Sequence, residues 1–468
     1  MMSDPKLLRP LVVDLDGTLC RTDTLWESFF AAWRLHWWLP LAAPMWLLRG
    51  RSALKQRLAA LALPDIASLP WNAAVIDALR TARAAGRQTV LATAADARVA
   101  HACAAQVGLF DRIIASDGVR NLKAGAKAEQ LLASFGEQGF DYIGDSRADL
   151  AVWPHAAQRL TVSSLLPDGG QRLPDSPPAG GLAAWLKLLR VRHWVKNVLV
   201  FVAPLAAHQW ASSASWYSAS LTFAAFCAVC SSIYVVNDLF DLASDRSHPS
   251  KRRRPLAAGD LQLAPAAMVS ALLLLAGFTL AALAGWSALA AIAMYVAVNA
   301  VYTSWLKRLP VYDVFCLAGL YTLRIVAGAL AVGVPLSAWL AAFSVFAFLS
   351  LALLKRAADI DRLAPDQVLP GRGYSGRDAG FVNGFGVGAA IAACLVLALY
   401  VASDQVSTLY GDPLWLWGLV AVVLLWLARM WRMAMAGLMD DDPVLFATRD
   451  TVSWGCALAV GVCVLLAV

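Results

Sequence analysis

The sequence predicts two fold classes in one chain: an α/β domain with a doubly wound parallel sheet and a helical cap, then an all-α polytopic membrane domain of nine transmembrane helices. The 468 residues are 59% hydrophobic and only 15% charged, which is not typical of a soluble enzyme. The apolar residues are also unevenly distributed. Residues 1 to about 180 carry ordinary charge, whereas apolar runs recur from Trp185 onward. Each run is long enough to cross a bilayer core of about 30 Å.

Composition divides the chain into three parts. We expect the α/β domain at residues 1–165 with its cap at about 20–80, a Pro/Gly-rich linker at 166–184, and the membrane domain at 185–468. The nine expected spans lie at roughly 195–213, 215–236, 264–284, 286–304, 311–332, 336–354, 380–402, 413–431 and 452–468.

Lys and Arg predict the orientation of these spans. Of the twenty such residues from position 187 on, nineteen lie before or at the start of the first expected span, or in and at the edges of the loops after the second, fourth, sixth and eighth. The twentieth, Arg324, lies within the fifth span. Because basic loops stay in the cytoplasm, we expect a multi-pass protein of the inner (cytoplasmic) membrane with a cytoplasmic N-terminal domain. The net charge of +7 indicates lipid headgroups or phosphates as partners, not nucleic acid, and no oligomeric state is predicted.

Polar residues stand at the ends of three expected strands of the α/β domain. "LVVDLDGTL" carries Asp14 and Asp16, "RQTVLATAA" carries Thr93, and "FDYIGDSRADLAVW" carries Asp145 and Asp149. Ligands of doubly wound sheets bind at the carboxyl ends of the strands, so we expect one shared site. These carboxylates, with a lysine from "NLKAGAKAEQLL", suit Mg²⁺ and a phosphoryl group.

The roles of these side chains follow from their chemistry. Asp14 is placed to attack phosphorus and Asp16 to move a proton, while Asp145 and Asp149 are placed to hold the metal. Thr93 and a lysine would stabilise the equatorial oxygens of the phosphoryl group.

The order DxDGT, strand-end Thr, Lys and GDxxxD resembles the haloacid dehalogenase-like (HAD) phosphatases over roughly residues 8–165. The resemblance implies a phosphomonoester substrate, an aspartyl-phosphate intermediate, and Mg²⁺ near all four aspartates, Asp14 and Asp16 included. Lys127 fits the lysine of this family better than Lys123 because it opens a helix, although Lys123 stays an alternative.

The expected cap contains "AAWRLHWWLPLAAPMWLLRG", with four Trp among twenty residues. Trp and Arg flanking a short apolar stretch suit the headgroup boundary of a membrane. The cap either rests on the membrane, where the phosphatase would meet a lipid-borne phosphate, or packs on its own sheet.

The stretch "NDLFDLASDRSHPSKRRRP" (residues 237–255) follows the second expected span. If the helix continues, Asp238, Asp241 and Asp245 share one face at i, i+3 and i+7. Three carboxylates so close repel one another unless a divalent cation lies between them, and Mg²⁺ is typically bridged by carboxylates to a diphosphate. The basic residues that follow supply donors for phosphate oxygens. A polybasic inner loop, the alternative, explains the Arg run but not the acidic residues.

A second set of charges follows the sixth expected span, in "LLKRAADIDRLAPDQVLPGRGYSGRD". Lys355 and Arg356 lie at the membrane end, with Asp359 and Tyr374 further along. As a second inner loop with acidic and basic residues, this set is a candidate to complete the metal–diphosphate site.

Two further positions carry polar groups near or within the membrane. Arg324 at membrane depth usually indicates a cavity or a bound anion, with a pair to a buried carboxylate such as Asp313 as the alternative. Lys196 and Asn197 at the start of the first span suit either a substrate contact or an anchor to lipid headgroups.

Nine spans with acidic inner loops resemble the UbiA superfamily of intramembrane prenyltransferases over about residues 185–468. Its motif NDxxDxxxD is met by Asn237, Asp238, Asp241 and Asp245, which the resemblance assigns to Mg²⁺ and diphosphate. The continuation "DRSHPSKRRRPLAAG" is similar to the DRxHPxKxxRP pattern of the decaprenyl-phosphate phosphoribosyltransferase branch. The phosphate-binding residues implied by that branch are Arg246, His248, Lys251, Arg254, Lys355 and Arg356. Asp359 stands where this branch has Glu, and the DxxxD spacing of the quinone branch is absent from the second loop.

These resemblances imply a bifunctional membrane enzyme. The membrane half would transfer 5-phosphoribose from phosphoribosyl pyrophosphate to a polyprenyl phosphate, with Mg²⁺ in both domains, and the HAD domain would remove the 5-phosphate of the product. A prenyltransferase that moves a prenyl group from prenyl diphosphate to an aromatic or glycerol-phosphate acceptor is one alternative. A non-enzymatic polyprenyl-phosphate transporter or scaffold is the other.

Overall fold

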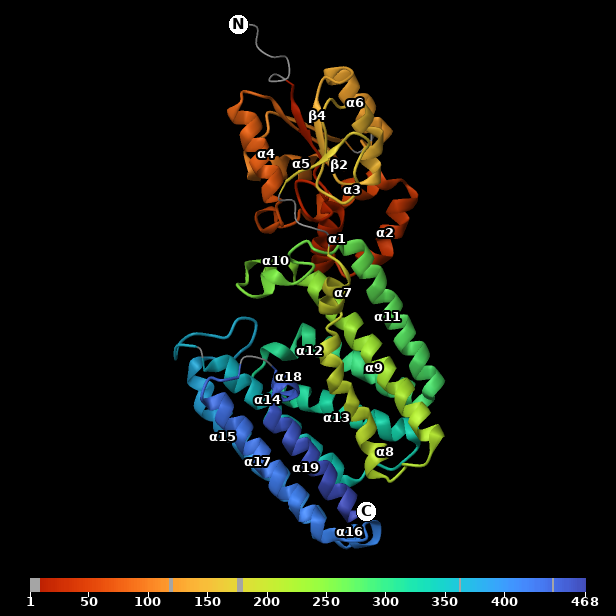
Figure 1. The fold of residues 1–468 in the computed structure, drawn as a ribbon, viewed down its shortest axis with the longest axis vertical. Helices are drawn as coiled ribbons and strands as arrows, with labels where there is room; N and C mark the ends of the chain where they lie inside the picture. Colours follow the sequence, from red (N-terminus) through yellow and green to blue (C-terminus); the bar gives the residue numbers. More distant parts are fainter. Residues whose placement is uncertain (1–8, 118–120, 175–179, 362, 440–441) are drawn as a thin grey trace. The chain divides into compact units, whose positions relative to one another are not determined.

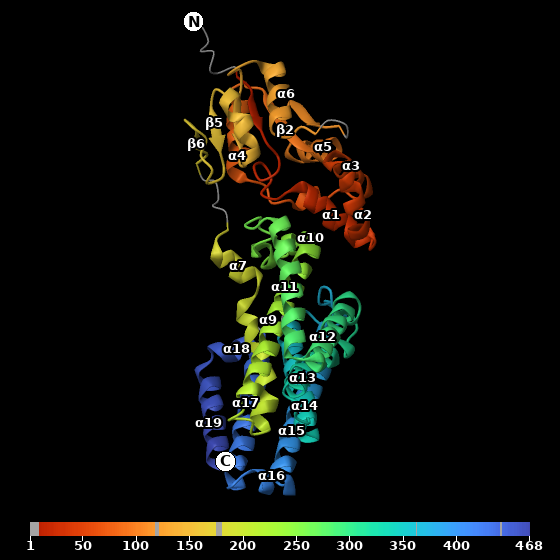
Figure 2. The same cartoon turned by 90° about the vertical axis from the view of Figure 1, so that its right-hand side faces the viewer.

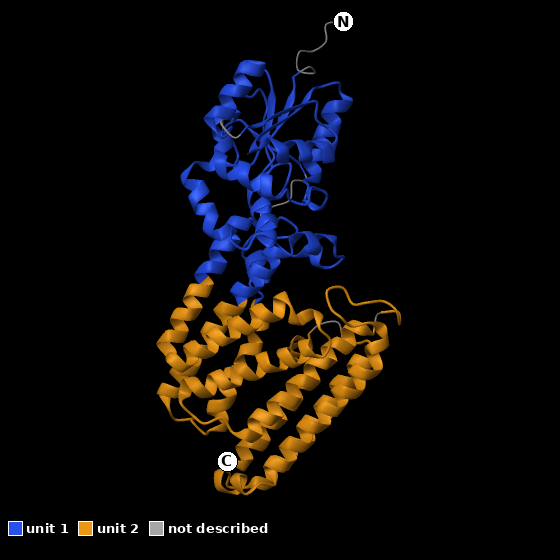
Figure 3. Cartoon of the chain, turned by 180° about the vertical axis from the view of Figure 1, so that it is seen from behind, with its two compact units in different colours: residues 1–190, 231–272 blue, residues 191–230, 273–468 orange. Residues whose placement is uncertain are grey.

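The computed structural model describes residues 9–117, 121–174, 180–361, 363–439 and 442–468. The chain forms two compact units, residues 1–190 with 231–272 (unit 1) and residues 191–230 with 273–468 (unit 2), as Figure 3 shows. Unit 1 therefore contains the α/β part together with a segment from the membrane half. The expected domain boundaries at 165 and 184 stay predictions.

Unit 1 is built on a six-stranded parallel sheet in the order β3-β2-β1-β4-β5-β6, as predicted for a doubly wound domain (Figure 1). Its strands are β1 (Leu11–Val13), β2 (Thr89–Asp96), β3 (Arg112–Ser116), β4 (Asp141–Gly144), β5 (Arg159–Thr161) and β6 (Gln171–Arg172). The order reverses direction at β1, so the carboxyl ends of β1 and β4 lie side by side, where such sheets bind ligands.

Helices cover both faces of the sheet because successive strand residues point to opposite sides. Val13 packs in one core with α4 (Ala73–Ala84) and α5 (Ala97–Val107), whereas Val12 packs in the other with α6 (Gly125–Phe135). Both cores are apolar, which fits a sheet buried on both faces.

The expected cap consists mainly of α1 (Thr24–Leu35), α2 (Leu39–Leu48) and α3 (Arg51–Leu61), which pack on one another (Figure 2). Helix α1 also shares a second core with the membrane-half segment of unit 1. There Phe30 packs with Leu239, Leu242 and Leu256. The ring of Trp33 lies 4.8 Å from that of Phe240. The remaining helices of unit 1 are η2 (Ile66–Ser68), η3 (Arg147–Ala151), η4 (Trp153–His155), α7 (Leu182–Leu188), α10 (Leu242–Ser247) and η6 (Lys251–Arg253).

Among its described residues, the named elements of unit 2 are all helices. Helices α9 (Ser213–Phe240) and α11 (Leu263–Ala284) contribute residues to both units, since the unit boundaries fall within them. The other elements of unit 2 are η5 (Val191–Phe201), α8 (Val202–Ala206), α12 (Trp286–Ser304), η7 (Leu306–Arg308), α13 (Tyr312–Val332), α14 (Ala338–Ile360), η8 (Gly376–Asp378), α15 (Ala379–Val401), α16 (Asp404–Leu409), η9 (Pro413–Trp415), α17 (Leu416–Met435), α18 (Pro443–Arg449) and α19 (Thr451–Ala467).

Within the described residues, seven helices are long and apolar enough to cross a membrane, or eight if α18 and α19, bent by 88°, form one span. The helical membrane half is confirmed, but the count of nine is not fully reproduced. The first expected span is divided into η5 and the five-residue α8. Lys196 and Asn197 are polar residues within that expected span, and Pro204 lies in its second half. Together they prevent one long apolar helix.

Helix α9 does not continue through the acidic stretch as one element. It ends at Phe240, and Asp241 (φ −98°, ψ 11°) separates it from α10. Helical hydrogen bonds still close on both sides, from Asp241 N to Asn237 O (2.9 Å) and from Asp245 N to Asp241 O (2.7 Å). The prediction of one continuous helical face is therefore replaced by two helices that meet at Asp241.

Candidate functional site

The carboxyl ends of β1 and β4 hold a cluster of buried carboxylates. One oxygen from each of Asp14, Asp145 and Asp149 lies within 4.8 Å of the other two. Gly17 makes this approach possible, because a Cβ on its backbone (φ +76°) would lie 2.2 Å from Asp145 Oδ2. The glycine of "DGT" is thus required where the two loops meet.

Lys127 of α6 supplies the positive charge of this cluster. Its Nζ lies 2.9 Å from Asp14 Oδ1 and 3.5 Å from Asp149 Oδ1, and it donates to Tyr142 Oη (3.0 Å). Burial alone would lower the pKa of Lys127, but Asp14 and Asp149 outweigh it, and the pKa lies above its usual value. Lys123 lines the same cavity, but the lysine whose Nζ contacts Asp14 is Lys127.

Too many carboxylates share this site for one lysine to balance. Burial raises the pKa of Asp14 to about 6, and burial with the charges of Asp14 and Asp149 raises that of Asp145 to about 8. Although burial opposes it, Lys127 and hydrogen bonds keep the pKa of Asp149 below its usual value. Mg²⁺ prefers oxygen ligands, and these carboxylates carry more negative charge than Lys127 balances. The residues present therefore fit this ion.

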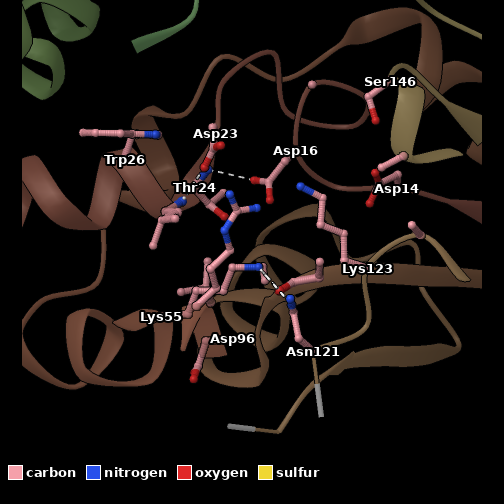
Figure 4. A pocket seen from close by; sticks show the side chains of 18 of the residues that line it. Asp14, Asp16, Asp23, Thr24, Trp26, Lys55, Asp96, Asn121, Lys123 and Ser146 are labelled. Carbon is pink, nitrogen blue, oxygen red and sulfur yellow. Dashed lines mark hydrogen bonds between the residues drawn. The ribbon is translucent and has the colours of Figure 1, made fainter. Parts of the chain in front are cut away.

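Asp16 lies beside the cluster at the base of the cap. Its Oδ1 accepts a hydrogen bond from Thr24 N, the first residue of α1 (2.8 Å; Figure 4). Burial, with the nearby charge of Asp23, raises the pKa of Asp16 to about 6. A carboxyl group with such a pKa is suited to both accept and donate a proton.

A cavity of about 720 Å³ opens over these residues. It is lined on the cap side by charged and apolar groups, among them Arg51, Lys55, Trp26, Leu47 and Leu54. Figure 4 shows Lys55 of α3 reaching Asn121, with Nζ 3.4 Å from Oδ1; the same Nζ donates to Ala94 O (2.6 Å). The cap thus forms one wall of the cavity and places cations in it.

Thr93 does not end its strand. Strand β2 runs on to Asp96, and the fully buried Thr93 accepts a hydrogen bond from Ala95 N (3.0 Å). Ala94, Ala95 and Asp96 line the cavity here. The phosphate contact of Thr93 therefore stays a prediction.

In the acidic stretch, arginines hold the aspartates. Arg254 Nη1 lies 3.1 Å from Asp238 Oδ1 and 2.6 Å from Asp245 Oδ2, and Arg190 Nη2 lies 2.7 Å from the same Asp238 oxygen. Both aspartates are almost fully buried. Arg190 also lies 4.4 Å over the ring of Tyr234. A guanidinium thus occupies the place between Asp238 and Asp245 where a cation was predicted.

Among the residues that the structure describes, Asp238, Asp241 and Asp245 do not form a close metal-ligand group like that of the α/β site. Asp238 and Asp245 contact the guanidinium groups of Arg190 and Arg254, and the three aspartates together offer the carboxylate oxygens that Mg²⁺ prefers as ligands.

The other predicted residues of this stretch have separate surroundings. Arg246 makes two hydrogen bonds to Glu27 of α1 (2.6 and 3.2 Å) and one to Ala257 O (3.1 Å). His248 Nδ1 lies 3.2 Å from Ser250 Oγ, and Lys251 opens η6 with an exposed side chain. Asn237 is half-buried. Arg246 is thus used to join the cap helix to this loop.

In unit 2, Arg324 and Asn197 are brought together. Arg324 Nε donates to Asn197 Oδ1 (2.9 Å), Nη1 to Leu320 O (2.6 Å) and Nη2 to Tyr295 Oη (2.9 Å). The guanidinium also lies 5.4 Å from the ring of Tyr321. Arg324 is 5% exposed, as expected for a guanidinium held inside a helical bundle.

Lys196 and Lys355 are also brought together, by a residue that the sequence analysis did not single out. Asp442 Oδ2 lies 2.7 Å from Lys196 Nζ and 3.3 Å from Lys355 Nζ. Although burial opposes it, these two charges hold the pKa of Asp442 well below its usual value.

Arg356 and Tyr374 meet at Asp313, and Arg356 also contacts Asp359. Arg356 Nε lies 2.8 Å from Asp313 Oδ2 and its Nη1 lies 2.8 Å from Asp359 Oδ2. Tyr374 Oη donates to Asp313 Oδ1 (2.7 Å). Asp313, suggested as a partner for Arg324, thus binds Arg356 and Tyr374.

Sequence reasoning missed five residues, most of which have partners distant along the chain. These are Glu27, Lys55, Tyr142, Arg190 and Asp442. The one usable signal was the acidic run "DDD" at residues 440–442, which lies in an otherwise apolar region. Of that run, only Asp442 lies within the described residues.

Comparison with known proteins adds to this geometry. The model of the UbiA prenyltransferase family matches residues 198–447. The chain belongs to the UbiA prenyltransferase family. Its apolar helices and this family make it a multi-pass membrane protein.

Three relatives of this UbiA-family chain extend the comparison. Uncharacterized protein y4nM of Sinorhizobium fredii is 35% identical over 457 residues, which cover 95% of this chain and 88% of the relative. Nodulation protein NoeC of Azorhizobium caulinodans is 37% identical over 279 residues, which cover 58% of this chain and 88% of the relative. Decaprenyl-phosphate phosphoribosyltransferase of Corynebacterium glutamicum is 35% identical over 182 residues, 38% of this chain and 52% of the relative. The likeness to y4nM thus includes the α/β part.

Solved structures align with both halves. A UbiA homolog from Archaeoglobus fulgidus bound to GPP and Mg²⁺ covers 60% of this chain and 99% of its own, at 14% identity and a TM-score of 0.47. The alignment with a probable phosphoserine phosphatase from Vibrio cholerae covers 35% of this chain and 58% of that protein, at 16% identity and a TM-score of 0.26. The phosphatase-like character of the α/β part rests on its motifs and on the geometry of its carboxylates and Lys127.

Proposed function

We propose that this UbiA-family protein is a bifunctional enzyme of the cytoplasmic membrane. Its membrane half transfers 5-phosphoribose from phosphoribosyl pyrophosphate to a polyprenyl phosphate, and its α/β part then removes the 5-phosphate. The likeness to decaprenyl-phosphate phosphoribosyltransferases supports the first step. The distribution of Lys and Arg supports a cytoplasmic α/β part.

For the transfer, the proposal assigns the leaving diphosphate to the acidic stretch. Asp238, Asp241 and Asp245 would hold Mg²⁺, which offsets negative charge on the departing pyrophosphate. Arg254 and Lys251 would contact phosphate oxygens, as charge-assisted donors do. The polyprenyl phosphate oxygen attacks C1 of the ribose while the C1–O bond to pyrophosphate breaks. The attacking oxygen is already anionic, so no general base is needed.

In unit 2, the proposal assigns further phosphate contacts to the lysines on Asp442. Lys196 and Lys355 are cations whose shared carboxylate orients them. Arg356 is held by Asp313 and Asp359, which supports a positioning role more than a direct contact. Arg324 is a candidate to hold the lipid phosphate.

For the second step, Asp14 attacks the phosphorus of the 5-phosphate, and the bond from phosphorus to the ribose oxygen breaks. Asp16 gives its proton to that oxygen and later takes one from the water that releases orthophosphate from Asp14. Asp14, Asp145 and Asp149 would hold Mg²⁺. Lys127 orients Asp14 through the 2.9 Å contact.

One observation carries the coupled function: the buried carboxylate cluster and the acidic stretch belong to the same compact unit. Transfer of 5-phosphoribose creates a phosphomonoester on lipid, and a phosphatase site in the same unit matches that product. A transporter or scaffold needs neither set of aspartates.

The family description favours a second candidate, transfer of a prenyl group from prenyl diphosphate. The two are separated by giving purified protein and Mg²⁺ either labelled phosphoribosyl pyrophosphate with polyprenyl phosphate, or labelled geranylgeranyl diphosphate with an aromatic or glycerol-phosphate acceptor. Label in lipid from the first donor alone supports our proposal. Transfer of the prenyl label to an aromatic or glycerol-phosphate acceptor supports the second candidate, and no transfer from either donor supports a scaffold.

The coupled step has its own test. Phosphate release is measured from lipid-linked 5-phosphoribose with the wild-type chain and with Asp14→Asn. Equal release from the two proteins would reject the assignment of the α/β part.

A further inference from the structure

We propose that helix α2 of the cap inserts into the membrane interface and forms the edge over which a lipid-borne phosphomonoester enters the phosphatase cavity. The insertion itself follows from the residues of unit 1. The identity of the substrate as lipid-linked 5-phosphoribose rests on the proposed function.

One side of α2 is apolar and faces away from the protein. Trp37, Leu41, Met45 and Leu48 are 80%, 74%, 65% and 89% exposed. Their spacing of four, four and three residues places Leu41, Met45 and Leu48 on one face of α2, with Trp37 on the same side just before the helix. The opposite side is buried, because Leu39 packs on α1 and α3. A contiguous exposed apolar stripe of this kind marks an interaction surface.

The charge around α2 favours an anionic lipid surface over a protein partner of mixed charge. From residue 28 to residue 64 the chain has five Lys or Arg and no Asp or Glu. Arg34, Arg49 and Arg51 flank α2 and are exposed. Basic residues beside an apolar stretch that contains Trp are typical of segments that bind at the headgroup level.

The position of α2 also matches that of a membrane surface. Leu47 of α2 and Gln262, which directly precedes α11, line the same cavity. Helix α11 is one of the helices able to cross a membrane, and its first turns within unit 1 expose Met268 and Leu272. The same cavity is therefore bordered both by α2 and by the residue that precedes a possible membrane span.

The same cavity connects this surface to the catalytic carboxylates. Leu47 is 48% exposed and also lines the cavity that contains Asp14 and Asp16. Trp26, Leu25 and Leu54 add apolar groups to its wall. An isoprenoid chain that remains in lipid at α2 would find an apolar border there, while its phosphorylated head reaches Asp14.

Spin labels test the insertion on the full chain in bilayer nanodiscs that contain anionic phospholipid. A variant without native cysteines receives Leu41→Cys or Leu48→Cys, and Leu166→Cys is the control, because Leu166 is exposed in the same unit outside the cap. We expect labels at 41 and 48 to be accessible to oxygen and protected from a water-soluble nickel chelate. The label at 166 should be accessible to the chelate.

Equal access of the chelate to positions 41, 48 and 166 would overturn the proposal, because α2 would then face water. Protection of 41 and 48 from both reagents would also overturn it, because a protein surface would cover α2. This measurement needs no substrate, so its outcome does not depend on the proposed function.

Kinetics test the entry route. Leu41→Glu combined with Leu48→Glu should lower kcat/KM for lipid-linked 5-phosphoribose in nanodiscs by roughly tenfold, because charge disfavours insertion. Hydrolysis of ribose 5-phosphate in solution should stay within about twofold, which also shows that the variant is folded. Leu166→Glu should leave both reactions unchanged. An equal loss on both substrates, or no loss on either, would overturn the entry route.

Discussion

At the scale of single residues, Lys127 balances two buried carboxylates in the α/β site. It is 3% exposed and contacts both Asp14 and Asp149. Removing one partner of a buried ion pair leaves an uncompensated charge, which costs more than the pair itself contributes.

We therefore expect Lys127→Met to lower the free energy of unfolding by about 3–5 kcal/mol and to abolish phosphate release. Lys123→Met is the matched control, because Lys123 is exposed and lines the same cavity. Thermal unfolding and phosphate release measure the two effects. Loss of release in Lys123→Met alone would assign the phosphatase lysine to Lys123.

Arg254 has a comparable place in the acidic stretch. It bonds Asp238 and Asp245 at once, so it keeps two buried carboxylates close together before any diphosphate arrives. Arg252, two residues before it, is exposed.

Arg254→Ala should lower kcat/KM for phosphoribosyl transfer by ten- to a hundredfold, because a hydrogen bond to a charged group contributes about 1.5–3 kcal/mol. Arg252→Ala should change it by less than about twofold, as expected for a solvated charge. The rate of label transfer into lipid measures both. Equal losses would show that the loop acts only through its total charge.

Residue types and spacing identified most of the charged groups but not their partners. Asp14, Asp145 and Asp149 were predictable because their motifs end strands of one sheet, whose topology brings them together, and Lys127 was preferred over Lys123 because it opens a helix. Asp442 was not, because 246 residues separate it from Lys196 and only the packing of helices brings them into contact.

At the scale of elements, α1 belongs to two hydrophobic cores. It packs with α2 and α3 in the cap, and with Leu239, Leu242 and Leu256 of the segment around the acidic stretch. The buried pair of Glu27 and Arg246 fixes the second contact.

A double-mutant cycle of Glu27→Ala and Arg246→Ala should give a coupling energy of about 1–3 kcal/mol, because both side chains are buried and doubly bonded. The pair Arg21–Asp260, partly exposed, is the control and should give less than about 1 kcal/mol. Unfolding of the detergent-purified chain measures both. A coupling near zero for Glu27 and Arg246 would mean that α1 is held by apolar contacts alone.

The positions of helices and strands were predictable where one hydrophobic pattern dominates the sequence. The three expected strands and most of the long apolar helices appear where their patterns predict them, because burial on both faces and burial in lipid each leave a clear signature, whereas β3, β5 and β6 were not predicted. The break at Asp241 and the division of the first expected span were not predictable. Both depend on how polar groups near a helix end find partners in the folded chain.

At the scale of the whole molecule, two chemically distinct carboxylate sites lie in one polypeptide. Asp14 belongs to the α/β cluster and Asp238 to the acidic stretch, and each set has its own cations. Their contributions to a two-step reaction are therefore separable by mutation.

Asp238→Asn should abolish incorporation of labelled phosphoribose into lipid but leave hydrolysis of ribose 5-phosphate within about twofold. Asp14→Asn should do the reverse, so lipid that retains its 5-phosphate accumulates. Chromatography of the labelled lipids distinguishes the two products. Accumulation of the dephosphorylated lipid in Asp14→Asn would place the second step on another protein.

The core shared by α1 and the segment from Leu239 to Leu256 bears on how such a protein can be divided. If the chain were divided at the Pro/Gly-rich linker and the two parts were produced separately, Phe30 and its neighbours would lose their apolar partners. Each part would then expose an apolar surface that favours aggregation. Loss or exchange of the phosphatase part during evolution would therefore require compensating substitutions at Leu239, Leu242 and Leu256, which cover Phe30.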